Sequence, residues 1–372
     1  MKIAHFILSM SVGGGEKLVR SLSQKIDIPG YTNQVTCFDR IDAFQDEFAA
    51  CGVDLTLMKR RQCLFDHRLV IPLVRMIKQQ NIHLIHAHDL SCLAYAVVAG
   101  KLTGIKVIMT EHSRHYIDNA LKRRVEKRVL MTGVSRLIEV SSELKQASIS
   151  KDLIPEQKIT VIENGVDMDL FRSAPRVQLH EELGLSHEQK LILTVGRLEK
   201  IKGQQYIVKA MELLSQKVKN LHLILVGDGG NRPALETQVR LAGLGESVHF
   251  MDVRNDIPGL MAASDLLVIP SESEGLPFVL LEAMAAGLPV VATAVGQIPD
   301  ILGNDKRGVL VPPKAPQALA AAMDKILKTD VHVFTDKAQA HVAAHYSEAI
   351  MLKRYEAIYR SILTDIYSFF HC

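Results

Sequence analysis

The amino-acid sequence predicts an α/β protein made of two doubly wound parallel sheets, each covered by helices on both faces. Short apolar runs alternate with amphipathic helical patterns along the chain, and this alternation is typical of parallel sheets. The runs give twelve candidate strands, more than one ordinary sheet of this kind holds. A length of 372 residues also indicates two domains rather than one.

The candidate strands are short and mainly apolar, as the buried strands of parallel sheets are. In the first half of the chain they are residues 3–8, 34–37, 84–87, 107–110, 136–140 and 159–162. In the second half they are residues 191–195, 222–226, 248–251, 266–269, 290–292 and 309–311. Helical patterns fill the gaps, and one example is the apolar face made by Leu18, Val19, Leu22 and Ile26.

The break between the two domains is expected near residues 169–185, where periodicity is lost before a strand–helix series restarts after Gly184. We therefore predict a first Rossmann-like domain over residues 1–168 and a second over 169–345. Two such domains bind ligands at the carboxyl ends of their strands, in a cleft that both domains face.

The composition limits the cellular locations that are expected for the protein. No segment has eighteen uninterrupted apolar residues, so no transmembrane helix is predicted. The apolar N-terminus is short and runs directly into glycine-rich sequence, which favours a buried first strand over a signal peptide. The five cysteines are scattered and form neither a disulfide framework nor a Cys-x2-Cys metal site, which fits a reducing cytoplasm.

Positive charge is concentrated in the first half of the chain. Residues 1–168 hold 23 Lys and Arg against 18 Asp and Glu, whereas the remainder holds 21 against 23. Basic clusters at residues 59–61 and 122–128 are either solvated faces or contacts with an anionic surface such as phospholipid. Nucleic acid is not expected as a partner, because aromatics make up only 5% of residues and Trp is absent.

Two glutamates mark one predicted helix in the second half. Glu282 is a lone carboxylate in the apolar run 277–286, and Glu274 lies eight residues earlier beside Gly275. Pro277 opens this helix and Gly287 closes it. A helix N-terminus suits a phosphate, and carboxylates accept strong hydrogen bonds from hydroxyls. The segment therefore predicts a site for a ligand with phosphates and sugars; the alternative is a buried helix with a solvated Glu282.

Two cations, Arg197 and Lys202, follow the candidate strand 191–195 within residues 196–203. Cations fixed at the carboxyl end of a strand stabilise the charge that develops on a departing diphosphate. A lysine-rich surface loop is the alternative. The three glycines at 13–15 similarly follow the first strand and open the first helix, where they allow a ligand to approach the backbone. A plain strand–helix turn is the alternative there, since neither a dinucleotide fingerprint nor a Walker A loop is present.

Several histidines cluster at the ends of two strands in the first half. The HExxH spacing is absent and no cysteine lies nearby in the sequence, so no metal site is predicted. His83 and His86 are interpreted as structural. A neutral imidazole at such a strand end can donate a hydrogen bond or shuttle a proton at pH 7.

Four segments of the sequence resemble one family. They are the E-x7-E pattern from Glu274 to Glu282, G-R-x4-K-G over residues 196–203, G-G-x-E over residues 13–16 and N-G-V-D over residues 164–167. Together they are similar to the family 4 glycosyltransferases, which are retaining enzymes of GT-B type. The resemblance implies a GT-B fold, with an acceptor-side first domain, a second domain that binds a nucleotide sugar, and a last helix, about residues 346–372, that packs back on the first domain.

The resemblance also implies roles for single residues. Glu282 would hold the ribose, and Glu274 with the backbone amides near Gly275 and Leu276 would hold the sugar. Arg197 and Lys202 would bind the diphosphate, and His112 would contact the donor sugar near the reacting carbon, with His88 on the acceptor side. The implied catalytic residues are thus His112, Glu274, Arg197 and Lys202, and the other donor-binding positions are Gly14, Gly15, Asn164, Val253, Gly275, Leu276 and Glu282. Asp252 stands where the family often carries glycine, which leaves the nucleobase open.

The expected function is transfer of a sugar from a nucleotide sugar, with a UDP-sugar favoured, to a glycan or lipid-linked acceptor in cell-surface polysaccharide or lipopolysaccharide biosynthesis. No metal or other cofactor is expected, because two cations and helix N-termini supply the charge that the diphosphate needs. The expected location is cytoplasmic, with peripheral contact at the inner face of the plasma membrane left open. The alternatives are a sugar-nucleotide epimerase or phosphorylase of GT-B fold, and a non-catalytic partner protein that binds a sugar nucleotide.

Overall fold

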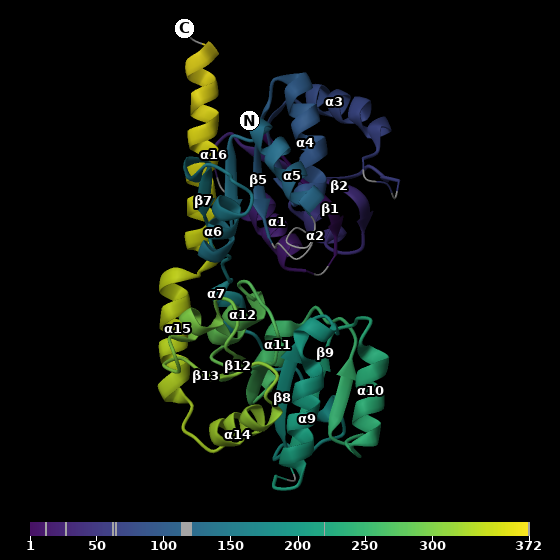
Figure 1. Cartoon of the computed structure of the whole chain (residues 1–372), viewed down its shortest axis with the longest axis vertical. Helices are drawn as coiled ribbons and strands as arrows, with labels where there is room; N and C mark the ends of the chain where they lie inside the picture. Colours follow the sequence, from purple (N-terminus) through teal and green to yellow (C-terminus); the bar gives the residue numbers. More distant parts are fainter. Residues whose placement is uncertain are drawn as a thin grey trace. The chain divides into compact units, whose positions relative to one another are not determined.

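The computed structural model describes residues 1–370 except 12, 27, 62, 64, 113–120 and 219, with the backbone alone at 333 and 364–370. Within it the chain forms two compact units (Figure 1). The first comprises Met1–Asn164 with Ala349–Cys372, and the second comprises Gly165–Glu348. Among the described residues, no helix is long and apolar enough to cross a membrane.

The first unit contains a parallel sheet with the strand order β3-β2-β1-β4-β5-β6-β7. Its strands are β1 (Lys2–Met10), β2 (Thr32–Ile41), β3 (Asp54–Leu57), β4 (Ile82–His88), β5 (Lys106–Glu111), β6 (Arg136–Glu139) and β7 (Ile159–Val161). Its helices are α1 (Gly14–Lys25), α2 (Gln45–Ala50), α3 (Val70–Gln79), α4 (Leu90–Thr103), α5 (Leu121–Leu130), α6 (Ser142–Ser150) and α16 (Glu348–Phe370).

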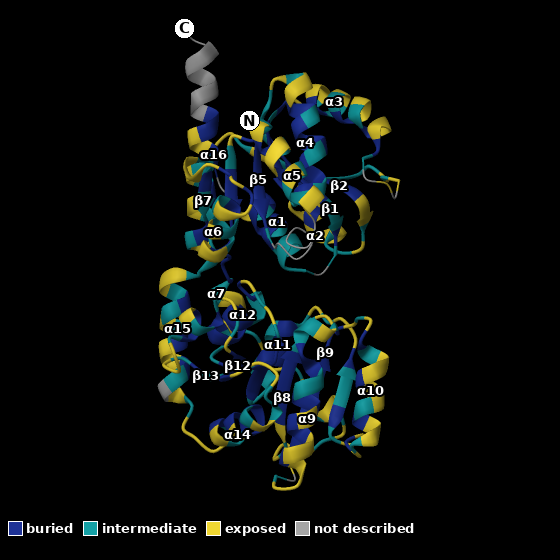
Figure 2. Cartoon of the chain, in the orientation of Figure 1, coloured by how far each residue is buried: buried dark blue, intermediate teal, exposed yellow. Residues whose placement is uncertain are grey.

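Side chains of this sheet alternate between two cores, because successive residues of a strand point to opposite faces. Ala4 packs in a cluster with residues of α3 and α4, whereas the preceding Ile3 packs in another with residues of α1 and α16. The last helix thus buries Tyr355 and Tyr359 against the first unit, although α16 follows the second unit in sequence. Figure 2 shows the central strands as buried and the exposed residues gathered on the outer surfaces of the helices.

The second unit contains a parallel sheet with the strand order β10-β9-β8-β11-β12-β13. Its strands are β8 (Lys190–Val195), β9 (Leu221–Val226), β10 (Val248–Met251), β11 (Leu266–Ile269), β12 (Val290–Thr293) and β13 (Val309–Val311). Its helices are α7 (Met168–Arg172), α8 (Leu179–Glu182), α9 (Gln204–Ser215), α10 (Arg232–Leu241), α11 (Ile257–Ala263), α12 (Phe278–Ala286), α13 (Ile298–Leu302), α14 (Pro316–Leu327) and α15 (His332–His345).

This sheet also separates two cores. Residues of α11 and α12 pack on one face with Leu191 and Leu193, and residues of α9, α10 and α14 pack on the other with Ile192. The predicted fold class of two doubly wound, Rossmann-like sheets is therefore confirmed. All twelve predicted strands lie within observed strands or overlap them, and β3 is an additional strand at the edge of the first sheet.

Candidate functional site

In the second unit, several predicted donor-binding residues gather at one edge of the sheet. Strand order changes direction between β8 and β11, and ligands of open α/β sheets bind outside the carboxyl ends of strands at such a switch point. Residues 196–203 follow β8 and include a 3₁₀ helix, Lys200–Lys202, before α9 begins at Gln204. Residues 270–277 follow β11 and lead into α12. The switch point thus brings the two predicted motifs together.

Lys202 and Glu274 form the central contact of this edge. The Nζ of Lys202 lies 2.8 and 2.9 Å from the two carboxylate oxygens of Glu274. Ser271 donates a hydrogen bond of 2.6 Å to Oε1 of the same carboxylate. The Glu274 side chain is 9% exposed and that of Lys202 is 26% exposed. The cation and the carboxylate are therefore held in place, and an anionic ligand at Lys202 would compete with Glu274 for it.

Two glycines allow the chain segments at this edge to pack closely. Gly203 has φ of +71°, and a Cβ there would lie 2.0 Å from the carbonyl oxygen of Pro270. Gly296 has φ of +53°, and a Cβ there would lie 1.9 Å from the carbonyl oxygen of Glu274. Side chains other than hydrogen are excluded by both the backbone angle and the space. These glycines therefore hold Lys202 and Glu274 at their observed separation.

Helix α12 has the predicted ends, with Pro277 before its first residue and Gly287 after its last. Glu282 is 4% exposed, so the alternative of a solvated Glu282 is wrong. Gly275 is exposed, and no atom lies within 4 Å of the position where its Cβ would be. Leu276 is buried. The N-terminal approach to α12 therefore offers open backbone beside Glu274.

Arg197 and Val253 have exposed side chains. The carbonyl oxygen of Arg197 accepts a 3.0 Å hydrogen bond from Nε2 of Gln204, which ties this loop to the start of α9. Asp252, the residue that departs from the family pattern, pairs with Arg232 at 2.5 Å. In place of the glycine common in the family, this chain therefore has a charged pair beside Val253.

In the first unit, three further predicted residues lie at the corresponding edge. The strand order changes direction between β1 and β4; α1 begins at Gly14 after β1, and His112 follows β5. A Cβ on Gly15 would lie 3.4 Å from the His112 ring, so the start of α1 packs against the imidazole. Burial lowers the pKa of His112 to about 4, although the negative charges of Glu16 and Glu111 oppose this shift. His112 is therefore neutral at pH 7.

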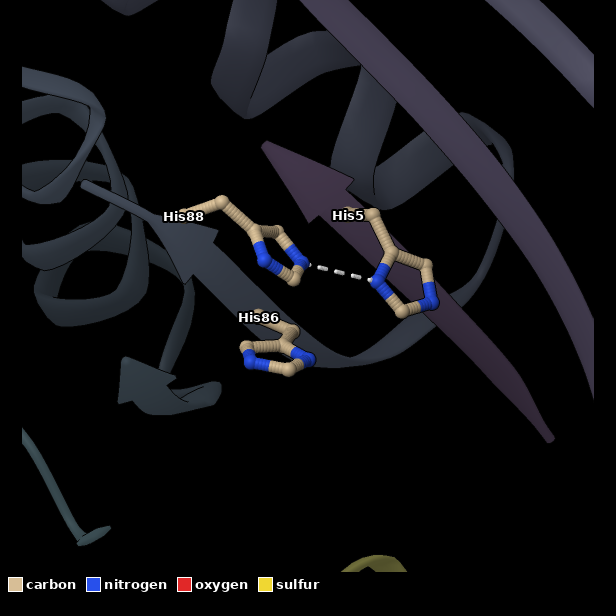
Figure 3. A group of neighbouring side chains, drawn as sticks. All are labelled: His5, His86 and His88. Carbon is tan, nitrogen blue, oxygen red and sulfur yellow. Dashed lines mark hydrogen bonds between the residues drawn. The ribbon is translucent and has the colours of Figure 1, made fainter. Parts of the chain in front are cut away.

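Three buried histidines form a cluster, His5 on β1 and His86 and His88 on β4 (Figure 3). Of these, His88 contacts His112. One ring nitrogen from each of the three lies within 4.8 Å of the other two, as the ligands of a metal would. The rings also bond to protein groups. His5 Nδ1 lies 3.1 Å from His88 Nε2, and His86 contacts Tyr359 and Thr110, each at 2.8 Å. A metal here would have to displace such bonds; the prediction of no metal site stays a prediction.

Two expectations for the first unit are wrong. His88, expected on the acceptor side, is fully buried and does not line a surface. Lys127, expected in an exposed basic cluster, is also fully buried, where it pairs with Glu111 and Asp152.

Asn164 is buried at the end of the first unit, and its Oδ1 has no hydrogen-bond partner in the described part of the chain.

Sequence reasoning missed two supporting groups. Ser271 holds Glu274 from three residues upstream, and its signal was proximity to a predicted site residue. His5 lies in the first strand, where an imidazole in an apolar run gave no hint of its partners on β2 and β4.

Comparison with known proteins identifies two family models along the chain. Residues 12–170 match the model "Glycosyltransferase Family 4", and residues 176–344 match "Glycosyl transferases group 1". Together they include all four predicted motifs and cover residues of both units, and α16 lies beyond the second match.

Two curated relatives align with most of the chain. N-acetyl-alpha-D-glucosaminyl L-malate synthase of Bacillus anthracis is 26% identical over 318 residues, which are 81% of this chain and 80% of the relative. UDP-Gal:alpha-D-GlcNAc-diphosphoundecaprenol alpha-1,3-galactosyltransferase of Escherichia coli is 26% identical over 327 residues, which are 84% of each chain.

Solved structures show the same fold. Anabaena HepE in complex with UDP aligns with a TM-score of 0.83 at 24% identity, covering 97% of this chain and 100% of HepE. The predicted resemblance is thus confirmed by both halves of the sequence and by the fold. The chain belongs to glycosyltransferase family 4, and it is a glycosyltransferase of this retaining, GT-B family that uses a nucleotide sugar.

Proposed function

We propose that the protein transfers a sugar, with retention, from a UDP-sugar to a lipid-linked glycan acceptor in cell-surface polysaccharide or lipopolysaccharide biosynthesis. The observation that carries the proposal is the pairing of Lys202 with Glu274 at the switch point of the second sheet. A diphosphate needs fixed positive charge as it leaves, and a sugar needs a hydrogen-bond acceptor beside it. This pair supplies both groups within one contact.

Each donor residue then has a distinct role. Lys202 and the exposed Arg197 neutralise the departing diphosphate, while Glu274 and the backbone amides of Gly275 and Leu276 bind the sugar. Glu282 binds the ribose. His112, with Gly14 and Gly15 beside it, contacts the donor sugar. Asn164, buried with an unpartnered oxygen, supports the donor side, and Val253 borders the nucleobase.

The charge of the leaving group sets the mechanism. As the glycosidic bond breaks, its electron pair goes to the diphosphate, which becomes more negative, so Lys202 binds it more tightly in the transition state than in the ground state. Glu274 is occupied by Lys202 and Ser271, an arrangement that favours sugar binding over attack on the anomeric carbon. We therefore favour attack of the acceptor hydroxyl from the face that the diphosphate leaves, with a phosphate oxygen taking the proton.

Lys202→Ala tests the proposal. We expect kcat to fall far more than the affinity for the donor, because the lost charge matters most in the transition state. Lys200→Ala, at an exposed lysine of the same 3₁₀ helix, is the matched control and should leave both constants nearly unchanged. Equal losses of turnover and donor affinity in Lys202→Ala would contradict transition-state stabilisation.

The choice of donor is supported by the relatives. HepE is solved with UDP and with UDP-glucose, and the Escherichia coli relative is named for UDP-Gal. Thermal-shift measurements with UDP, GDP, ADP and TDP test this choice, since a specific ligand stabilises the folded state according to its affinity. The largest shift should come from UDP, and a larger shift from another nucleotide would overturn the choice of base.

Helix α5 supports an acceptor at an anionic membrane surface. Leu121, Val125 and Val129 are 74, 55 and 62% exposed, and their spacing of four residues places them along one face. Lys122 and Arg128 are exposed beside this stripe. An exposed apolar stripe with flanking cations is typical of a helix that lies on an anionic membrane. The Escherichia coli relative is named for a diphosphoundecaprenol acceptor, which is lipid-linked.

Liposome co-sedimentation tests the membrane contact. Binding should require anionic lipid and fall strongly in Lys122→Glu/Arg128→Glu, which reverses both exposed cations of the face. Arg75→Glu/Lys78→Glu makes the same change in net charge on exposed positions of α3 and should bind like the unmodified protein. Binding that ignores both anionic lipid and the α5 substitutions would remove the membrane from the proposal.

A further inference from the structure

A chain of hydrogen-bonded side chains crosses the first sheet and ends at His112. Asn33 on β2 contacts His5 Nε2 through its Oδ1 at 3.4 Å. His5 Nδ1 contacts His88 Nε2 at 3.1 Å, as Figure 3 shows. His88 Nδ1 contacts His112 Nε2 at 3.3 Å. The four side chains come from three adjacent strands, β2, β1 and β4, and from the residue after β5. We call this chain the imidazole relay.

The orientation of Asn33 sets the direction of the relay. Its Nδ2 donates a 3.1 Å hydrogen bond to the backbone carbonyl oxygen of Ser23, and a carbonyl oxygen can only accept. The amide oxygen must therefore face His5. Because that oxygen also can only accept, Nε2 of His5 must carry the proton.

The remaining positions follow step by step. A neutral imidazole has one N–H and one bare nitrogen, so Nδ1 of His5 is the bare nitrogen and accepts from His88. His88 must then be protonated on Nε2 and bare on Nδ1. Its Nδ1 accepts from His112, which must be protonated on Nε2. Every bond in the relay has one donor and one acceptor only in this arrangement.

Neutral rings are what this environment favours. Burial lowers the pKa of His5 to about 4 and that of His112 to about 4, and it lowers the pKa of His88 well below its ordinary value. An imidazolium would also place a second N–H against a neighbouring N–H, which breaks the relay. At pH 7 each ring is therefore neutral and carries its proton on one nitrogen only.

We propose that the imidazole relay fixes His112 as its Nε2–H tautomer, leaving Nδ1 as a hydrogen-bond acceptor toward the donor sugar. This inference rests on the proposed function only for the identity of the ligand. The bare nitrogen selects a group that donates, such as a hydroxyl or an amide N–H, and disfavours a carboxylate, which can only accept. Asn33 and His5 are thus positioning residues that act through His88.

A metal is the competing interpretation of the histidines in the relay. His86, the third histidine of the cluster, has Nδ1 at 2.8 Å from the Tyr359 hydroxyl and Nε2 at 2.8 Å from Oγ1 of Thr110. Both nitrogens of His5 are also bonded within the relay. A bound ion would have to take the place of bonds that the protein already supplies, so the relay accounts better for these atoms.

Long-range ¹H–¹⁵N spectra of the full chain, with labelled histidine, test the tautomers without using activity. We expect protonated Nε2 and bare Nδ1 for His112, His88 and His5 at pH 7. A protonated Nδ1 at His112, or an imidazolium, would overturn the proposal. One equivalent of bound metal in elemental analysis would also overturn the proposal, if removing that metal changes the histidine resonances.

Asn33→Leu removes the anchor of the relay at nearly constant volume. In this variant His112 should show averaged ring shifts, and kcat should fall while KM for the donor changes less. His83→Leu is the matched control, because His83 lies on β4 but bonds to the backbone N–H of Lys2. Unaltered His112 shifts in Asn33→Leu would overturn the relay. Fixed tautomers in a protein without transferase activity would instead contradict the proposed function alone.

Discussion

The two units share one architecture, but they differ in the polar groups that they bury. The first unit buries several charged side chains and three histidines, namely Asp66, Glu111, Lys127, Glu139, Asp152, His5, His86 and His88. Among the described residues of the second unit, Glu282 is the one charged residue that is buried. The first unit therefore uses polar networks inside its core, whereas the second keeps most charged groups at the ends of its strands.

The buried charges of the first unit form one network around Lys127. Its Nζ contacts Glu111, lies 2.9 Å from Asp152 and 3.7 Å from Glu139, and donates to Ser148 at 2.9 Å. Burial, and then the charge of Glu111, raises the pKa of Glu139 well above its usual value. The network thus joins α5 to β5, the strand that ends just before His112.

The two units position their candidate residues in different ways. In the second unit, glycine backbones and one partly buried ion pair place Lys202 and Glu274. In the first unit, buried hydrogen bonds position His112 from within the sheet. A change inside the first core should therefore disturb both folding and the site, while a change at the second site should mainly affect ligand binding.

The largest expected effect is from Lys127→Met, which leaves buried carboxylates without their cation. Breaking a buried charge network by removing one partner costs about 3–5 kcal/mol. In urea unfolding, we expect the free energy of unfolding of the first unit to fall by this amount. Lys122→Met, at an exposed lysine of the same helix, should change stability by less than about 0.5 kcal/mol. Similar stabilities for the two variants would show that the buried network is not what holds this unit together.

The second prediction concerns Glu282, the buried carboxylate of the second unit. Glu282→Gln keeps the shape but removes the charge, and a hydrogen bond to a charged group contributes about 1.5–3 kcal/mol. Donor affinity should therefore fall by roughly 10- to 150-fold in titration calorimetry with the preferred nucleotide. Glu212→Gln, at an exposed glutamate on α9, should bind normally. Normal binding by Glu282→Gln would remove the ribose role.

Much of the second unit could be predicted from sequence, because its signals are local. Glycines, cations and the ends of α12 all lie within short segments that follow apolar strands. Edge strand β3 was missed because Asp54–Leu57 has no continuous apolar run to distinguish it. A strand at the edge of a sheet is half exposed, so its sequence is less apolar than that of a central strand.

The polar interior of the first unit could not be predicted in the same way. Lys127 appears as one cation of a basic run, and only tertiary packing shows that it points inward to Glu111 and Asp152. The imidazole relay likewise joins residues that are 28 and 83 positions apart. No periodic pattern in a single sequence encodes such contacts, because each residue taken alone fits a surface or a strand.

The third prediction is that acid weakens the first unit partly through His5. Its pKa is about 4 when folded and near 6.5 when unfolded, so the unfolded state binds more protons between these values. Stability from His5 is full above pH 6.5 and is lost as pH falls toward 4. Between pH 7.5 and 5, the unmodified protein should lose about 1–2 kcal/mol more than His5→Phe in urea unfolding.

Other groups in this unit titrate too, and the variant separates them from His5. Burial raises the pKa of Asp89 to about 6, and Glu139 has a raised pKa, so both carboxyls favour folding at lower pH and oppose the histidines. Both carboxyls are present in the unmodified protein and in His5→Phe, whereas the His5 imidazole is present only in the unmodified protein. Equal slopes in the two proteins would mean that His5 does not titrate in this range.

The smallest expected effect on stability is from Gly275→Ala, and it separates the two ways in which glycine serves the second site. No atom lies within 4 Å of a Cβ at Gly275, so stability should change by less than about 0.5 kcal/mol. Gly296→Ala is the contrasting variant, because its Cβ would meet the carbonyl of Glu274 at a positive φ, and it should cost more than about 1 kcal/mol. If the open backbone at Gly275 meets the donor, Gly275→Ala should weaken donor binding while melting at the unmodified temperature. A variant that binds the donor normally would mean that this backbone stays clear of the sugar, and the contact would then rest on Glu274 alone.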